Sequence, residues 1–125
     1  MTAKFFLVFA SIAGFVSVAL GAFGAHALQE RLSQSGRLDT YQTAVQYQFY
    51  HSLALLAIGI LLTKYQNAAL QYAGISMVIG ILVFSGSLYI LCFTGMRWLG
   101  AVTPIGGTFF LIAWALLVYG VSKAL

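Results

Sequence analysis

The stretch Gly21–His51 reads GAFGAHALQERLSQSGRLDTYQTAVQYQFYH, and it is the only long polar interval in an otherwise apolar chain. One histidine lies near its start, at His26, and a second ends it, at His51. Long apolar runs precede and follow it. We therefore interpret this stretch as the turn between two membrane-spanning helices, together with the first turns of the second helix.

The composition of the chain supports a membrane environment. Of its 125 residues, 62% are hydrophobic and only 6% are charged, whereas a soluble domain carries about 25% charged residues. A chain this short leaves much of its surface exposed, so it cannot hide this apolar surplus from water. We expect a single transmembrane domain over residues 1–125, with the lipid bilayer as its surroundings.

The net charge of +4 comes from six cations that are scattered singly along the chain. Nucleic-acid binding requires clustered phosphate contacts, so no nucleic-acid partner is expected. The single cysteine, Cys92, lies in an apolar run and has no partner for an internal disulfide. It is most simply a small core residue.

Four apolar stretches are expected to span the membrane, at about residues 5–25, 43–63, 68–93 and 99–122. At ~1.5 Å rise per residue, the first stretch reaches about 31 Å, the thickness of the hydrocarbon layer. A cleaved signal peptide beginning at Lys4 is the alternative, but the apolar stretch exceeds the usual ~7–15-residue core. The fold class is therefore predicted to be all-α, a four-helix antiparallel transmembrane bundle.

The connection between the first two spans has its own pattern. Leu28 and Leu32 are four residues apart in an otherwise polar segment, which predicts a short interfacial helix between helices 1 and 2. Asp39 is the expected N-cap of the next helix, which should begin at about Thr40.

Small residues recur on the predicted spans at intervals that bring them to one face. In lipid, such faces let helices approach closely, because hydrophobicity itself gives helices no reason to associate. We expect helix packing through Gly14, Gly21, Gly80, Gly106 and Gly120.

The cations divide equally between the two faces of the predicted bundle, so the positive-inside count does not decide its orientation. The lysines are on the side of the termini and the arginines on the side of the hairpin: Lys4, Lys64, Lys123 and Arg31, Arg37, Arg97. Because Lys4 precedes the first helix, which usually dominates, we expect both termini to lie in the cytoplasm.

The polar side chains of the predicted spans gather on the hairpin side. The candidate polar cluster consists of His26, Tyr47, Gln48, His51, Ser85, Ser87, Tyr89, Arg97 and Thr103. Ionisable groups within membrane segments often mark a pocket, proton relay or metal site. The alternative is that these groups hydrogen-bond one another and hold the bundle together, with His26 capping the end of helix 1.

Catalytic chemistry finds little support in the sequence. Two histidines without a cysteine pair fall short of a closed zinc set, so no metal site is expected. Haem ligation by His26 and His51 stays open, because the corresponding helix ends would be adjacent. Ser85-Gly86-Ser87 is not a nucleophile elbow, and we expect no catalytic residue and no cofactor.

Four patches together resemble the domain of unknown function 423 family of small bacterial integral membrane proteins. They are Gly21–His26, Tyr47-Gln48 with His51, Phe84–Tyr89, and Thr103-Pro104 with Gly106-Gly107. The resemblance covers nearly the whole chain and implies a multi-pass inner-membrane protein. It brings no reaction, substrate or catalytic residue.

Three functional hypotheses follow. The first is a non-enzymatic structural or accessory membrane protein that forms a homo-oligomer or joins a larger membrane complex through small-residue helix faces. The second is a small transporter or channel component with a polar pocket on the hairpin side. The third is an enzyme or cofactor carrier that uses the histidines.

Overall fold

Helices make up almost the whole of the described chain, residues 2–125 of the computed structural model. In chain order they are α1 (Ala3–Ala25), α2 (Gln29–Gln34), α3 (Leu38–Lys64), α4 (Ala68–Gly80), the π-helical turn η1 (Ile81–Ser85), α5 (Gly86–Thr94) and α6 (Leu99–Ala124). α4, η1 and α5 follow one another without a break and form one rod.

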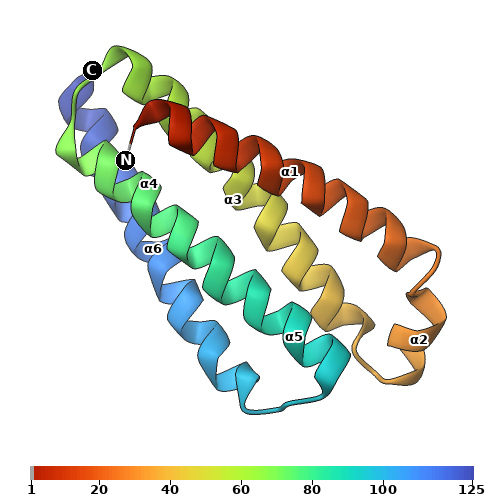
Figure 1. Cartoon of the computed structure of the whole chain (residues 1–125). Helices are drawn as coiled ribbons and strands as arrows, with labels where there is room; N and C mark the ends of the chain where they lie inside the picture. The colour runs from red at the N-terminus through yellow and green to blue at the C-terminus, as the bar shows by residue number, and fades with distance from the viewer. Residues whose placement is uncertain (1) are drawn as a thin grey trace.

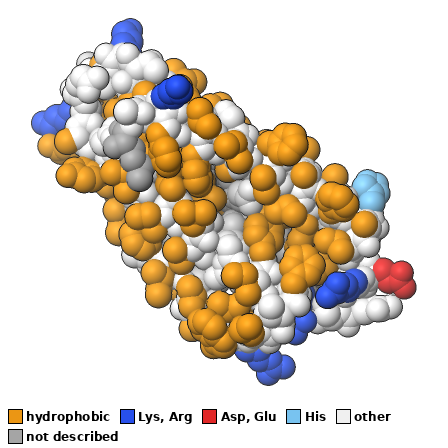
Figure 2. All heavy atoms as spheres, viewed as in Figure 1, with side chains coloured by type: hydrophobic (Ala, Val, Ile, Leu, Met, Phe, Trp, Pro, Cys, Tyr) orange, Lys and Arg blue, Asp and Glu red, His pale blue; other side chains and the backbone are white. Residues whose placement is uncertain are grey.

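Four rods are long and apolar enough to cross a membrane: Ala3–Ala25, Leu38–Lys64, Ala68–Thr94 and Leu99–Ala124. They run antiparallel, and both termini lie at the same end of the bundle (Figure 1). Hydrophobic side chains cover much of its body, and charged side chains lie at its two ends (Figure 2). The predicted four-helix transmembrane bundle is confirmed, as is the short helix between the first two spans.

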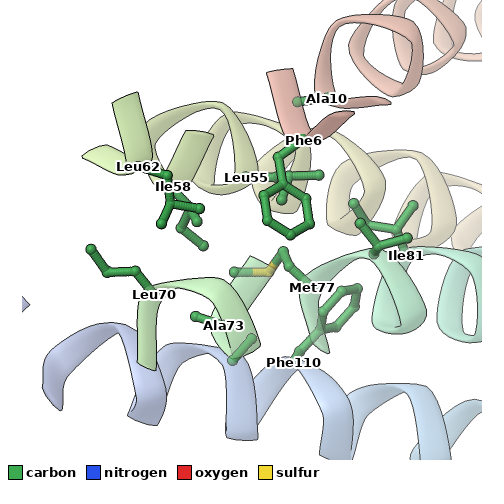
Figure 3. Close-up of a cluster of buried hydrophobic side chains, with 12 residues drawn as sticks. Phe6, Ala10, Leu55, Ile58, Leu62, Leu70, Ala73, Met77, Ile81 and Phe110 are labelled. Atoms are coloured by element: carbon green, nitrogen blue, oxygen red, sulfur yellow. The ribbon is translucent and has the colours of Figure 1, made fainter. Parts of the chain in front are cut away.

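The core joins all four rods (Figure 3). α1 packs along α3, α6 packs along α4 and η1, and α3 connects the two pairs. Side chains at the centre, including Phe6, Leu55 and Met77, are fully buried. Because lipid is as apolar as these side chains, close van der Waals packing rather than exclusion of water favours this arrangement.

The five glycines predicted to lie at helix contacts differ in how closely a neighbouring helix approaches them. A methyl group added at Gly80, Gly106 or Gly120 would lie less than 3.0 Å from a neighbouring helix. At Gly21 the nearest atom is a Val45 methyl carbon at an ordinary 3.4 Å, and at Gly14 nothing lies within 4 Å. Three of the five therefore allow close helix contact within the chain, and Gly14 does not.

The turn into α3 differs from the prediction. Asp39 is not the N-cap: α3 begins at Leu38 with Arg37 as its cap, and Asp39 lies in the first turn. The cause is Gly36, whose φ of 74° reverses the chain and lets the Arg37 N–H bond the Leu32 carbonyl at 2.9 Å. The carboxylate of Asp39 still lies near the positive end of the helix dipole.

The third rod contains the π-helical turn, which the sequence did not predict. Within it, the Ser85 hydroxyl donates to the Ala44 carbonyl of α3 at 2.9 Å. On the other side, the Phe84 backbone lies against Gly106 of α6. Such turns occur frequently at functional sites, and this one lies beside the polar residues described next.

Candidate functional site

Gln48 is the centre of the polar interior. Its side-chain NH₂ donates to the Ala13 carbonyl of α1 at 2.9 Å, and its side-chain carbonyl accepts from the Tyr89 hydroxyl of α5 at 2.7 Å. Gln48 is only 5% exposed. One amide from α3 therefore ties together three of the four rods.

Serine hydroxyls make further hydrogen bonds in the interior, some beside Gln48 and some between α5 and α6. Ser17 donates to the same Ala13 carbonyl at 2.7 Å, and Ser52 donates to the Gln48 backbone carbonyl at 2.5 Å. The hydroxyls of Ser87 and Thr103 bond each other at 2.7 Å and join α5 to α6. Throughout residues 2–125, no buried side-chain nitrogen or oxygen lacks a partner, as the absence of water in a bilayer requires.

His51 belongs to an aromatic stack between α3 and α6. Its ring lies parallel to Phe110, with centroids 3.5 Å apart and planes 9° apart, and Trp114 approaches edge-on at 6.0 Å. Its Nδ1 lies 2.6 Å from the Tyr47 carbonyl. Because a carbonyl only accepts, Nδ1 carries the proton in this hydrogen bond.

The depth of these groups differs from the expectation. Gln48 bonds Ala13, near the middle of the 23-residue α1, and His51 lies near the middle of the 27-residue α3. Gln48 and His51 thus lie nearer the middle of the bundle than predicted, whereas Thr103, the fifth residue of α6, lies toward the hairpin end. The reason is that α3 starts at Leu38, so its first turns already occupy the hairpin end.

Two members of the predicted cluster lie apart from it. His26 is exposed at the C-terminal end of α1, where its backbone N–H bonds the Ala22 carbonyl at 3.2 Å. Arg97 is exposed in the turn before α6. The structure therefore separates the nine residues into five groups. Gln48 bonds Tyr89, Ser87 bonds Thr103, and His51 stacks with Tyr47. Ser85 bonds the Ala44 backbone, and His26 and Arg97 lie apart at the end of the bundle.

Joint haem ligation by the two histidines is contradicted by their placement. Gly24, two residues before His26, packs on Tyr41, and Tyr41 precedes His51 by ten residues, or about 15 Å of helix at ~1.5 Å per residue. Among residues 2–125, no group of three or more His, Cys, Asp and Glu side chains could hold a metal ion.

Tyr41 was not among the predicted cluster residues, yet it is buried between α1 and α3 and is only 1% exposed. Its hydroxyl donates to the Leu20 carbonyl at 2.5 Å, and its ring fills the space beside Gly24, where an added methyl would lie 2.3 Å from a ring carbon. The two glycines of the GAFGAH patch were the available signal for a bulky neighbour.

Two hollows adjoin the network. An apolar groove of about 290 Å³ lies between α1, η1 and α5, with Gln48 and Tyr89 among its lining residues. A second hollow of about 270 Å³ lies at the hairpin end between α1 and α3, lined in part by Tyr41, Gln42 and Gln46. The groups at both are neutral amides and hydroxyls, which bind by hydrogen bonding.

Paired substitutions measure how strongly the central amide holds the rods. Gln48→Leu and Tyr89→Phe should each destabilise the protein, and the double variant should lose less than the sum, with a coupling energy of about 1 kcal/mol. Unfolding in sodium dodecyl sulfate, followed by circular dichroism, gives these energies. Ser87→Ala with Tyr89→Phe is the control pair, and its effects should be additive, since Ser87 bonds Thr103 and Tyr89 bonds Gln48 rather than each other. A coupling near zero for Gln48 and Tyr89 would contradict the observed hydrogen bond.

Four antiparallel spans, whose buried polar groups hydrogen-bond one another, define a small multi-pass integral membrane protein. The model of the family described as Protein of unknown function (DUF423) matches residues 20–107. The chain belongs to this family, in agreement with the resemblance carried by its four patches.

Relatives from Escherichia coli and Staphylococcus epidermidis are similar to this chain over nearly their whole lengths. The UPF0382 inner membrane protein YgdD of Escherichia coli is 39% identical over 123 residues, which cover 98% of this chain and 93% of the relative. A UPF0382 membrane protein of Staphylococcus epidermidis is 42% identical over 120 residues, covering 96% and 97%. No solved structure matches the chain.

Proposed function

We propose that this chain is a non-enzymatic accessory protein of the bacterial inner membrane that acts by packing against other copies of itself. The observation that carries the proposal is the complete pairing of the buried polar groups. Groups that already satisfy one another hold helices together and leave few donors or acceptors for a substrate. The lipid-facing surface is then the part of the molecule available for interaction. In this proposal both termini are cytoplasmic, because Lys4 precedes α1.

The surface that best suits self-association is a groove of about 460 Å³ between the outer faces of α1 and α3. Gly14 lines it, together with Ser11 and Phe49. Nothing in the chain lies within 4 Å of a methyl added at Gly14, so internal packing does not require glycine there. A small residue at this depth permits a second helix to approach closely, and we assign that helix to another copy of the chain.

Gly14→Leu tests this surface without disturbing the core. We expect the wild-type protein to form a homo-oligomer in mild detergent, and Gly14→Leu to weaken the association about tenfold, equivalent to ~1.4 kcal/mol. Native mass spectrometry and analytical ultracentrifugation measure the oligomer.

The matched control is Gly86→Leu. Gly86 also has nothing within 4 Å of an added methyl, but it lines the other groove, between α1, η1 and α5. It should leave the oligomer intact. A monomeric wild-type protein would refute self-association, and equal effects of both variants would refute the assignment to the Gly14 groove.

A small transporter or channel component is the second candidate. The hollow at the hairpin end supports it, because its lining mixes the Tyr41, Gln42 and Gln46 side chains with small residues of α1. If the protein is a transporter that uses His51, the titratable imidazole must contribute to flux in addition to its packing role. Substitution of His51 by phenylalanine keeps the packing and removes the titratable group, and so tests this requirement.

A further inference from the structure

Three arginines lie at the hairpin end of the bundle, in or beside the turn that follows α5. The guanidinium carbon of Arg31, on α2, lies 5.7 Å from the centre of the Phe93 ring. A guanidinium nitrogen of Arg37 lies 3.0 Å from the position that a methyl added at Gly95 would take. Arg97 follows in the same turn. Arg31 and Arg37, which are distant in sequence from this turn, therefore lie against it, and Arg97 is part of it.

None of the three guanidinium groups is neutralised within the described chain. The side-chain carboxylates are Glu30 and Asp39, and neither forms an ion pair with an arginine in residues 2–125. Glu30 instead accepts a hydrogen bond from the Gln34 side chain at 3.4 Å. Donors without acceptors at a membrane surface are suited to an external anion.

The lysines at the opposite end are arranged differently. Lys64 lies over the Tyr65 ring at 5.5 Å, and Lys123 lies over the Tyr119 ring at 5.7 Å. Lys64 and Lys123 are near the ends of different rods, and each contacts an aromatic ring at most four residues away in the chain. An ammonium is a compact, strongly hydrated charge, whereas the planar guanidinium binds phosphate oxygens with two parallel hydrogen bonds.

Neighbouring features place the arginines near lipid headgroups. Trp98, beside Arg97, is 64% exposed, and exposed tryptophan next to a span is typical of headgroup depth. α6 begins directly after it and has no acidic residue in its first turn, so the positive end of its dipole adds to the arginine charges. Figure 2 shows blue side chains of Lys or Arg at this end of the apolar body, with a red acidic side chain beside them.

We propose that Arg31, Arg37 and Arg97 form a binding site for the phosphodiester headgroup of an anionic phospholipid. The headgroup lies between α2 and the α5–α6 turn, and its acyl chains extend along the apolar body of the bundle. The site is separate from the Gly14 groove, which lies on α1 and α3 nearer mid-depth. Its lipid preference follows from charge, because a zwitterionic lipid carries its own neutralising cation.

The test compares two triple variants of equal charge change. R31Q/R37Q/R97Q removes the arginines, and K4Q/K64Q/K123Q removes the lysines of the other end. Each protein is titrated in detergent with phosphatidylglycerol or phosphatidylcholine, and bound lipid is counted by native mass spectrometry. At roughly fivefold in affinity per arginine near an anionic lipid, the arginine variant should lose at least tenfold in phosphatidylglycerol affinity. The lysine variant should lose less than twofold in phosphatidylglycerol affinity. Phosphatidylcholine should bind weakly to the wild type and to both variants.

Several results would overturn the site. Equal losses in both triple variants would mean that net charge attracts the lipid without a site, and unchanged binding by the arginine variant would remove it altogether. Inorganic phosphate is the second probe: if it displaces phosphatidylglycerol at millimolar concentration, the site binds free phosphate rather than a lipid. If the triple variant loses its helical circular dichroism, the exposed Arg31→Gln variant alone should still show the roughly fivefold loss.

Discussion

Gly106→Ala is expected to lower the free energy of unfolding by about 3 kcal/mol, the upper part of the usual range for overpacking. An added methyl would lie 2.4 Å from the Phe84 backbone nitrogen and 2.7 Å from its Cα. A flexible side chain could move away, but these atoms belong to the π-helical turn. The change must therefore push α6 away from η1 or alter the turn itself. Denaturation in sodium dodecyl sulfate, monitored by circular dichroism, measures the loss.

The neighbouring glycine provides the control. A methyl added at Gly107 meets only the Phe84 ring, at an ordinary 3.9 Å, so Gly107→Ala should change stability by less than about 1 kcal/mol. Both variants make the same chemical change in the same turn of α6, which cancels any difference in helix propensity. Equal effects of the two variants would show that the contact between α6 and η1 is not as close as the structure has it.

The rods themselves could be predicted because their signal is large and local. Each is a run of apolar residues long enough for the bilayer, and the polar stretch from Ala27 to Asp39 interrupts the pattern clearly. The Leu28 and Leu32 pair also identified α2. Its apolar stripe, however, packs inward rather than toward lipid: Leu32 is 1% exposed and forms a second core cluster with Tyr41 and Cys92.

The depth of the polar groups could not be predicted in the same way. Gln42 and Gln46 are exposed toward the hairpin end, whereas Gln48, two residues further along, is buried and bonds α1 and α5. Both kinds of residue occur in one continuous segment, and composition does not separate them. The role of each residue depends on whether its side chain faces another helix or the outside. That direction is known only once the positions of the neighbouring helices are known.

The π-helical turn also lacked a local signal. Ile81–Ser85 reads as ordinary spanning sequence, and the turn becomes understandable only through its neighbours, Ala44 on one side and Gly106 on the other. The patches behind the family resemblance contain these contacts. Phe84 and Ser85 come from one patch and Gly106 from another, so residues that appeared as separate motifs are partners in space.

His51→Ala is expected to destabilise the protein by about 3 kcal/mol, because removing a ring that stacks between helices leaves a cavity. The ring is 6% exposed and lies flat on Phe110 of α6. His51→Phe should cost less than about 1 kcal/mol, since the stack persists and only the bond from Nδ1 is lost. Unfolding of both variants in sodium dodecyl sulfate measures this difference.

The same pair of variants distinguishes packing from transport. If His51 acts only by stacking, then His51→Phe should resemble the wild type in stability, in oligomeric state and in any proton or solute flux of reconstituted liposomes. A transporter that uses the imidazole would instead lose its flux in His51→Phe while keeping its stability, because phenylalanine preserves the shape and removes the titratable nitrogens. That result would favour the transporter over the accessory protein. A His51→Phe variant as unstable as His51→Ala would contradict the stacked arrangement itself, since the ring would then contribute little beyond its hydrogen bond.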